Sequence, residues 1–339
     1  MSLILKCEIK IGKAKFIGVN DIVVTRSIHS IAQKCVIKLP ISAVIKNTSG
    51  VSTPVKVADY IKKDDEVTVT LWYDGFEKKQ EFFGYLKIIN RKQPLELECE
   101  NAVYLLRGKT FKKSFKTVTL KNLLQYITDG TGITLHPTIA TEQYQLEIKN
   151  FQIPDKDGIW VLEQLRDKYM QTVYFTGDKE LFVGLAYTNQ TGSVKYDMAK
   201  NIISTNDLKW QEKDDVKIKV RCVYWDKKGK HHEIAFGDDK AKKELADSDV
   251  EIRTIHIHDV KDTTQLKQIA QAEAEKYKYS GYKGKFDAFL IPFCLPMMEA
   301  KIENKQYPER AGDYYISGVT TTFGTGGARR KVEIDIKVN

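Results

Sequence analysis

The stretch TTTFGTGGARRKVEIDI, residues 320–336, decides how the end of this 339-residue chain folds. Glycines beside cations suggest a phosphate-binding loop, but such a loop requires a helix directly after its glycines. Here the residues that follow Arg329 and Arg330 alternate between apolar and charged, which predicts a strand. We therefore predict a β-hairpin whose turn contains Gly326 and Gly327. Binding of an anion or of a partner by Arg329 and Arg330 is the alternative.

Alternation of the same kind runs through the first third of the chain. The segment 66–89 predicts two strands joined by a turn at Asp74-Gly75, because an Asp-Gly pair tolerates the positive φ of a tight hairpin. The composition of NTSGVSTPVK at 47–56 predicts a loop. So many short strands do not lie flat, and residues 1–108 are therefore predicted to close into a small barrel or sandwich.

The middle third, residues 109–190, changes character. The spacing of the leucines in TLKNLLQYITDGTG (119–132) predicts a helix, with Thr119 as the N-cap and Gly130 as the end. We expect a strand at about 144–153, a second amphipathic helix, and two short strands around a glycine turn. Together these elements predict a compact α/β module.

From residue 191 to residue 339 the β pattern returns. The run DVKIKVRCVYWD at 215–226 alternates and leads to a predicted turn at Lys228-Gly229. One helix is predicted over 263–279, and further strands lead to the hairpin described first. The predicted fold class is therefore α+β, mostly β: a β domain, an α/β module and a second β domain with one helix.

Composition bounds the class of protein. The net charge is +9, most of the excess lies in the first 110 residues, and no long block of like charges occurs. This pattern is typical of a solvated surface with a positive bias. The five cysteines are odd in number and far apart, so we predict buried, reduced thiols in a reducing compartment. No apolar run is long enough for a membrane helix, and the N-terminus does not read as a signal peptide.

Catalytic and metal-binding motifs are not apparent. The sequence contains no GxSxG or HExxH motif and no Cys–His motif of a nucleophilic enzyme. His256 and His258 could share one strand face, and His231-His232 lie in a lysine-rich segment, but neither pair is part of a four-ligand zinc pattern. We therefore expect no catalytic residue, no metal and no cofactor. A nucleic-acid-binding protein remains an alternative, without any RNP-like motif to favour it.

Several stretches, taken in order, resemble one known family. They are VVTRSIHSIAQKCVIKLP, DDEVTVTLWYDGFEKKQEFFGYLKIIN, PLELECENAVYLLR, TLKNLLQYITDGTGITL, IPDKDGIWVLEQLRDKYMQTVYFTGDKELFVG and YPERAGDYYISGVTTTFGTGGARRKVEIDI. Together they span nearly the whole chain. In this order the chain resembles the phage late control protein D or baseplate hub family of contractile tails. The hub part of type VI secretion spike proteins is similar.

This resemblance implies two tube-like antiparallel β-barrels, at 1–108 and 191–339, joined by the α/β module at 109–190. It implies a homotrimer whose six barrels imitate a hexamer, so that a six-fold tail tube meets a three-fold spike. The implied partners are further copies of the chain, the tail tube protein and a separate spike protein, with DNA passing through the lumen and no membrane anchor. The implied location is the virion tail baseplate or an injection particle that assembles in the bacterial cytoplasm.

Within that resemblance, turn and hairpin residues carry the structural roles. Glycines would shape the barrels, Asp74 would support the first hairpin turn, and Tyr314 and Ile316 would pack in the last barrel. The glycines are Gly75, Gly84, Gly312, Gly326 and Gly327. Another class of function stays open: a module of the same machine that binds or degrades cell-wall glycan.

Overall fold

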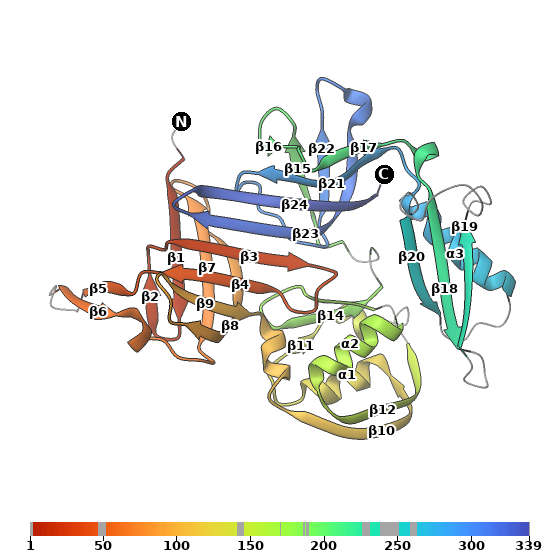
Figure 1. The fold of residues 1–339 in the computed structure, drawn as a ribbon, viewed down its shortest axis with the longest axis horizontal. Coiled ribbons are helices and arrows are strands. Elements are labelled where there is room, and N and C mark those ends of the chain that lie inside the picture. The colour runs from red at the N-terminus through yellow and green to blue at the C-terminus, as the bar shows by residue number, and fades with distance from the viewer. Residues whose placement is uncertain are drawn as a thin grey trace.

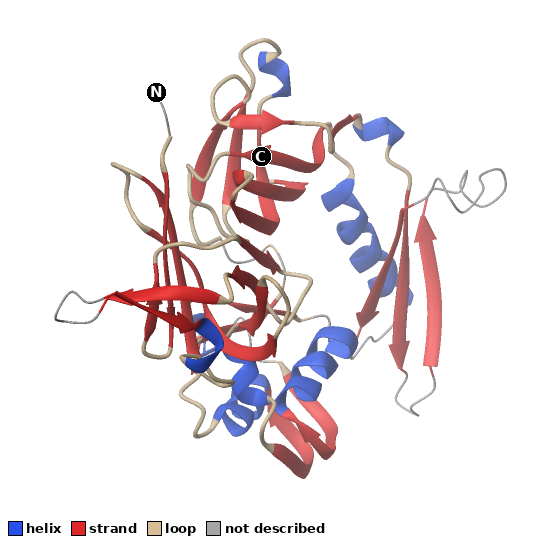
Figure 2. Ribbon diagram, turned by 60° about the vertical axis from the view of Figure 1, so that its left-hand side comes forward, coloured by secondary structure: helices blue, strands red, loops and turns tan. Residues whose placement is uncertain are grey.

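The computed structural model describes residues 3–46, 52–140, 146–169, 171–185, 187, 190–225, 231–237, 251–257 and 263–338. Strands predominate throughout the molecule, as predicted (Figure 2). The largest element is one 14-stranded sheet to which both β regions contribute.

The first β region supplies seven strands to this sheet. They are β1 (Leu5–Ile11), β2 (Ala14–Phe16), β3 (Asp21–Ser27), β4 (Lys34–Leu39), β7 (Glu66–Tyr73), β8 (Lys79–Asn90) and β9 (Leu95–Glu100). Their order is β3-β4-β9-β8-β7-β1-β2, and every pairing is antiparallel. Ile9 of β1 and Ile22 of β3, from strands far apart in this order, lie in the same buried cluster. The sheet therefore curls round one core, as the alternating pattern predicts.

The second β region supplies the other seven strands. They are β15 (Ser193–Asp197), β16 (Ile202–Ser204), β17 (Leu208–Gln211), β21 (Gly281–Ala288), β22 (Glu299–Glu303), β23 (Gly312–Gly324) and β24 (Gly327–Lys337). Tyr196 of β15 and Phe286 of β21 share a second buried cluster with Tyr314 and Ile316 of β23. This part of the sheet thus has a core of its own.

One long strand joins the two β regions. The first part of β23 pairs with β22, and its second part, from Gly318 to Gly324, pairs with β3 (Figure 1). We call this β3–β23 pairing the seam. The predicted boundaries after residues 108 and 190 fall between elements and remain our proposal for the domain division, but the two β regions share one sheet.

The middle region contains the predicted helices and strands. Its elements are β10 (Thr110–Thr119), α1 (Leu120–Thr128), β11 (Thr134–Leu135), β12 (Glu147–Asp157), α2 (Gly158–Tyr169), β13 (Thr172–Phe175) and β14 (Glu180–Gly184). Thr119 caps α1 as predicted, since its hydroxyl accepts a hydrogen bond from the Asn122 amide at 3.2 Å. The strand predicted at 144–153 lies further along the chain, because β12 extends through Pro154 to Asp157 while it pairs with β10.

Two predictions are wrong. The segment 47–56 was predicted to be a loop, but its end forms β6 (Ser52–Lys56), which pairs with β5 (Ser42–Lys46) in a hairpin that projects from the barrel (Figure 1). Three strands assigned to the second barrel form a separate sheet, with α3 (Thr263–Tyr277) in contact with two of them. They are β18 (Ile218–Trp225), β19 (His231–Gly237) and β20 (Glu251–Ile257). The predicted Lys228-Gly229 turn lies outside the described residues.

The prediction of buried, unpaired cysteines is confirmed, since all five thiols are free and buried. Burial raises the pKa of the Cys35 thiol, and it raises that of Cys222 to about 11. Because the thiolate is the reactive form, we expect the native protein to react very slowly with an aromatic disulfide reagent at pH 8. All five thiols should react once the chain is unfolded in guanidinium. Rapid labelling of the native protein would contradict this expectation.

Candidate functional site: a buried ion pair at the seam

The terminal hairpin has the strand–turn–strand structure expected from its sequence. Gly324 of β23 pairs with Gly327 of β24 across the turn, and Gly327 adopts a φ of +105°, which favours glycine. The two arginines that follow have different environments. Arg329 is exposed, and its Nη1 donates to the Ala328 carbonyl at 2.7 Å. Arg330 is 0 % exposed.

Period-two alternation explains why Arg330 is buried. In β24 it lies in phase with Ala328 and Val332, which face the interior. Its guanidinium meets the carboxylate of Glu81, which is 1 % exposed. Nη2 lies 2.5 Å from Oε1 and Nη1 lies 3.2 Å from Oε2, so the contact is bidentate. The expected anion is thus a carboxylate of the same chain, and Arg330 is not open to an outside anion.

A β-bulge aims Glu81 inward. Between β7 and β8, Val69 pairs with Phe82 and Thr70 pairs with Gln80, which leaves Glu81 as the extra residue. Both Glu81 and Phe82 are therefore buried, although neighbours in a regular strand face opposite sides. Because of this bulge, the alternation of the sequence does not predict that Glu81 is buried. The burial of Arg330 could have been predicted, because Arg330 lies in phase with Val332 in the alternating pattern.

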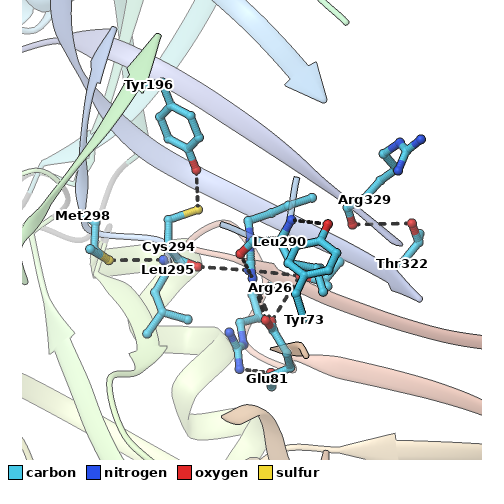
Figure 3. Close-up of polar contacts among 12 residues, drawn as sticks. Arg26, Tyr73, Glu81, Tyr196, Leu290, Cys294, Leu295, Met298, Thr322 and Arg329 are labelled. Carbon is cyan, nitrogen blue, oxygen red and sulfur yellow. Dashed lines mark hydrogen bonds and ion pairs between the residues drawn. The ribbon is translucent and has the colours of Figure 1, made fainter. Parts of the chain in front are cut away.

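Further polar contacts surround the pair. Thr321 of β23 donates to Glu81 Oε2 at 3.2 Å, and Arg330 donates to the carbonyls of Leu290 and Cys294 at 3.2 and 3.5 Å. Arg26 of β3 donates to the Glu81 carbonyl, and Figure 3 shows these two residues close together. We call Arg26, Glu81, Thr321 and Arg330 the seam cluster. It draws on β3, β8, β23 and β24, and so it ties the first β region to the second.

The electrostatics favour a charged pair. Burial by itself would lower the pKa of Arg330, but the Glu81 carboxylate raises it, so the guanidinium stays protonated. The guanidinium carbon lies 5.1 Å from the centre of the Phe293 ring, within the range of a cation–π contact. A buried pair of this kind adds little net stability, but removal of one partner leaves an uncompensated charge. The pair links β8 of the first β region to β24 of the second within the shared sheet.

The other predicted site residues are spread over the fold. Gly75 has a φ of +82° beside the exposed Asp74, and Gly84 lies against the backbone of β9. Tyr314 is fully buried, and its hydroxyl accepts a hydrogen bond from the Tyr282 amide at 2.9 Å. Burial raises the pKa of this hydroxyl to about 12. Gly312 begins β23. The structure does not bring these residues together into one site, and their barrel-shaping roles remain our proposal.

Clusters suited to metal binding are not found among the described residues, where no group of three or more His, Cys, Asp or Glu side chains could hold an ion. His258 and the side chains of His231, His232 and His256 lie outside the described part of the structure. No helix within the described ranges is long and apolar enough to cross a membrane.

The fold, with two β regions that each have a core and meet at the seam, was compared with known proteins. No family model and no curated protein matches the chain. Solved structures match along almost its whole length. The 43 kDa tail protein of prophage MuSo2 from Shewanella oneidensis has a TM-score of 0.62 at 12% identity, over 97% of this chain and 98% of that one. A tail protein from Neisseria meningitidis MC58 has a TM-score of 0.62 at 10% identity, over 98% and 96%.

A type VI secretion protein has the same fold. The E. coli c3393 protein, described as a component of that system with structural similarity to tail proteins of bacteriophage T4, has a TM-score of 0.58. The identity is 10%, and the match covers 98% of this chain and 77% of that one. At such identities the likeness concerns the fold. It confirms the resemblance read from the sequence at that level.

Proposed function

We propose that this protein is a structural baseplate hub of a phage tail or a phage-like contractile injection machine. In this proposal three copies form a pseudo-hexameric ring that joins the six-fold tail tube to a three-fold spike. The chain contributes architecture and no catalysis. The machine would assemble in the bacterial cytoplasm, and the protein would lie in the baseplate of the tail or particle.

The observation that carries the proposal is the presence of two β regions in one chain. Each has its own buried core, and they lie side by side in one sheet joined at the seam. Three such chains would supply six similar units, which is one solution to a mismatch between three-fold and six-fold symmetry. The fold shared with prophage tail proteins supports this reading.

The proposed partners follow from the same position in the particle. They are further copies of this chain, the tail tube protein and a spike protein. The neighbours with this fold include a chain of the Francisella PdpA–VgrG complex, and the match covers 58% of that chain. DNA passing through the lumen would meet the surface of the ring, and the positive net charge is compatible with that passage.

The first test is the solution mass, measured by light scattering over a concentration series. We expect a mass of three chains at high concentration, falling towards that of one chain of 38.8 kDa on dilution. Negative-stain images of the trimer should show a ring with six lobes. A monomer at every concentration, in the presence and absence of the tube protein, would contradict the proposal.

A further inference from the structure

A groove opens on the first β region, and its lining reaches Asn20, next to the end of the seam. Its cavity volume is about 930 Å³, and it lies between the β2 end of the sheet and the projecting β5–β6 hairpin. Phe16 and Val19 form part of its floor and pack against the buried core. We call it the β2 groove. Its lining residues are Lys13, Ala14, Lys15, Phe16, Ile17, Gly18, Val19, Asn20, Pro40, Ala43, Val44, Val55, Val57 and Tyr60.

The walls of the β2 groove expose large apolar side chains. Ile17 is 81 % exposed, Val44 is 64 % exposed and Tyr60 is 50 % exposed. Single exposed apolar residues are normal on a protein surface, but several that line one groove mark an interaction site. The groove therefore offers a contact area for apolar side chains.

The backbone beside the groove is also open to pairing. Among the described strands, β2 pairs only with β1, so it forms one end of the 14-stranded sheet. An edge strand presents unpaired N–H and C=O groups, and an extended peptide can add to it as a further strand. The β5–β6 hairpin forms a separate two-stranded sheet on the other side of the groove. A two-stranded hairpin is stabilised when something packs against it.

The positive charge of the lysines that line the β2 groove favours an extended partner that carries carboxylates. Among the described residues that line it, Lys13 and Lys15 are the only charged ones, and none of these described residues is Asp or Glu. Lys15 lies 2.8 Å from Glu8 of β1, whereas Lys13 makes no ion pair with a described residue. A partner with carboxylates would complement these lysines and a basic partner would be repelled.

We propose that the β2 groove binds an extended segment of another protein in which apolar residues alternate with Asp or Glu. The segment's backbone pairs with β2, its apolar side chains lie between Ile17 and Val44, and its carboxylates meet Lys13 and Lys15. The period of two in a strand puts these two kinds of side chain on opposite faces, as the groove requires. This inference goes beyond the hub proposal and stands whether or not copies of the chain form a ring.

The test uses the full chain and a fluorescein-labelled peptide of about seven residues, in which Asp or Glu alternates with Val or Ile. Fluorescence anisotropy should show saturable binding that weakens at high salt. Ile17→Asp should weaken binding by about tenfold or more, and Lys13→Glu by several-fold. Both residues are exposed, so the variants should fold. Ile203→Asp is the matched control, because it alters an exposed isoleucine of β16, at the other end of the sheet.

Four results would overturn the proposal. The first is the absence of saturable binding, and the second is equal binding of a peptide with Lys in place of every Asp and Glu. The third is self-association of the chain that Ile17→Asp abolishes while the peptide does not compete, which would assign the groove to a contact between copies. Loss of peptide binding in Ile203→Asp would likewise count against the groove as the site.

Discussion

Replacement of Arg330 by Met is expected to lower the free energy of unfolding by about 3–5 kcal/mol. The physical reason is the charge left behind. Glu81 is 1 % exposed and would lose both nitrogen partners at its carboxylate. Met has a similar length and fills most of the space of the arginine, so the loss measures the uncompensated charge more than a cavity.

Urea unfolding followed by tryptophan fluorescence would measure this change. Arg329→Met is the matched control, since Arg329 is the exposed neighbour on the same strand, and we expect a change within about 0.5 kcal/mol. The double variant Glu81→Leu with Arg330→Met should recover most of the stability, because both charges are then absent. An Arg330→Met variant as stable as Arg329→Met would show that the seam cluster is not a buried ion pair.

The seam cluster also bears on the proposed hub. Its four residues come from strands of both β regions, so the double variant tests whether the charge pair holds their relative orientation. One outcome is a double variant that regains its stability and still fails to form the assembly of the parent chain. In that case the ion pair sets the relative orientation of the two β regions as well as contributing to stability. Some buried ion pairs specify a conformation without adding net stability, and this experiment tests that role for Arg330 and Glu81.

Gly84→Ala is expected to cost about 3 kcal/mol of folding stability. A Cβ at this position would lie 2.1 Å from the Glu100 carbonyl oxygen and 2.7 Å from Phe82 Cζ. The obstacle at 2.1 Å is backbone of the adjoining strand β9, which cannot move aside as a flexible side chain can. The strands β8 and β9 would have to separate, with loss of their hydrogen bonds at this point.

Two other glycines provide graded controls for Gly84→Ala. Gly326 has nothing within 4 Å of an added Cβ and does not have a left-handed φ, so Gly326→Ala should leave stability nearly unchanged. Gly75 also has open space, but its φ of +82° should cost Gly75→Ala about 1–2 kcal/mol. Thermal unfolding of the three variants would rank them. Gly84→Ala with a midpoint like that of Gly326→Ala would contradict the packing found at β9.

Local sequence patterns were enough to predict whether most segments form helices or strands and which of their residues face the interior. The alternation after Arg330 predicted β24, and the leucine spacing with Thr119 predicted α1 and its cap. These features depend on contacts between residues close in the chain, whose periods of two and 3.6 are visible in the sequence. The same reasoning placed the five cysteines in the interior, because Cys is a small hydrophobe that favours cores.

Tertiary structure decided which strands pair and which charges meet. Nothing local shows that β23 leaves β22 to pair with β3, or that β18, β19 and β20 form a sheet of their own. Glu81 and Arg330 are 249 positions apart, and the bulge that turns Glu81 inward breaks the period on which the sequence reading depends. The sequence by itself therefore determined most helices and strands, which of their residues face the interior, and the resemblance to a known family. The seam and its ion pair needed the folded chain, because their energies come from contacts between distant segments that no local period encodes.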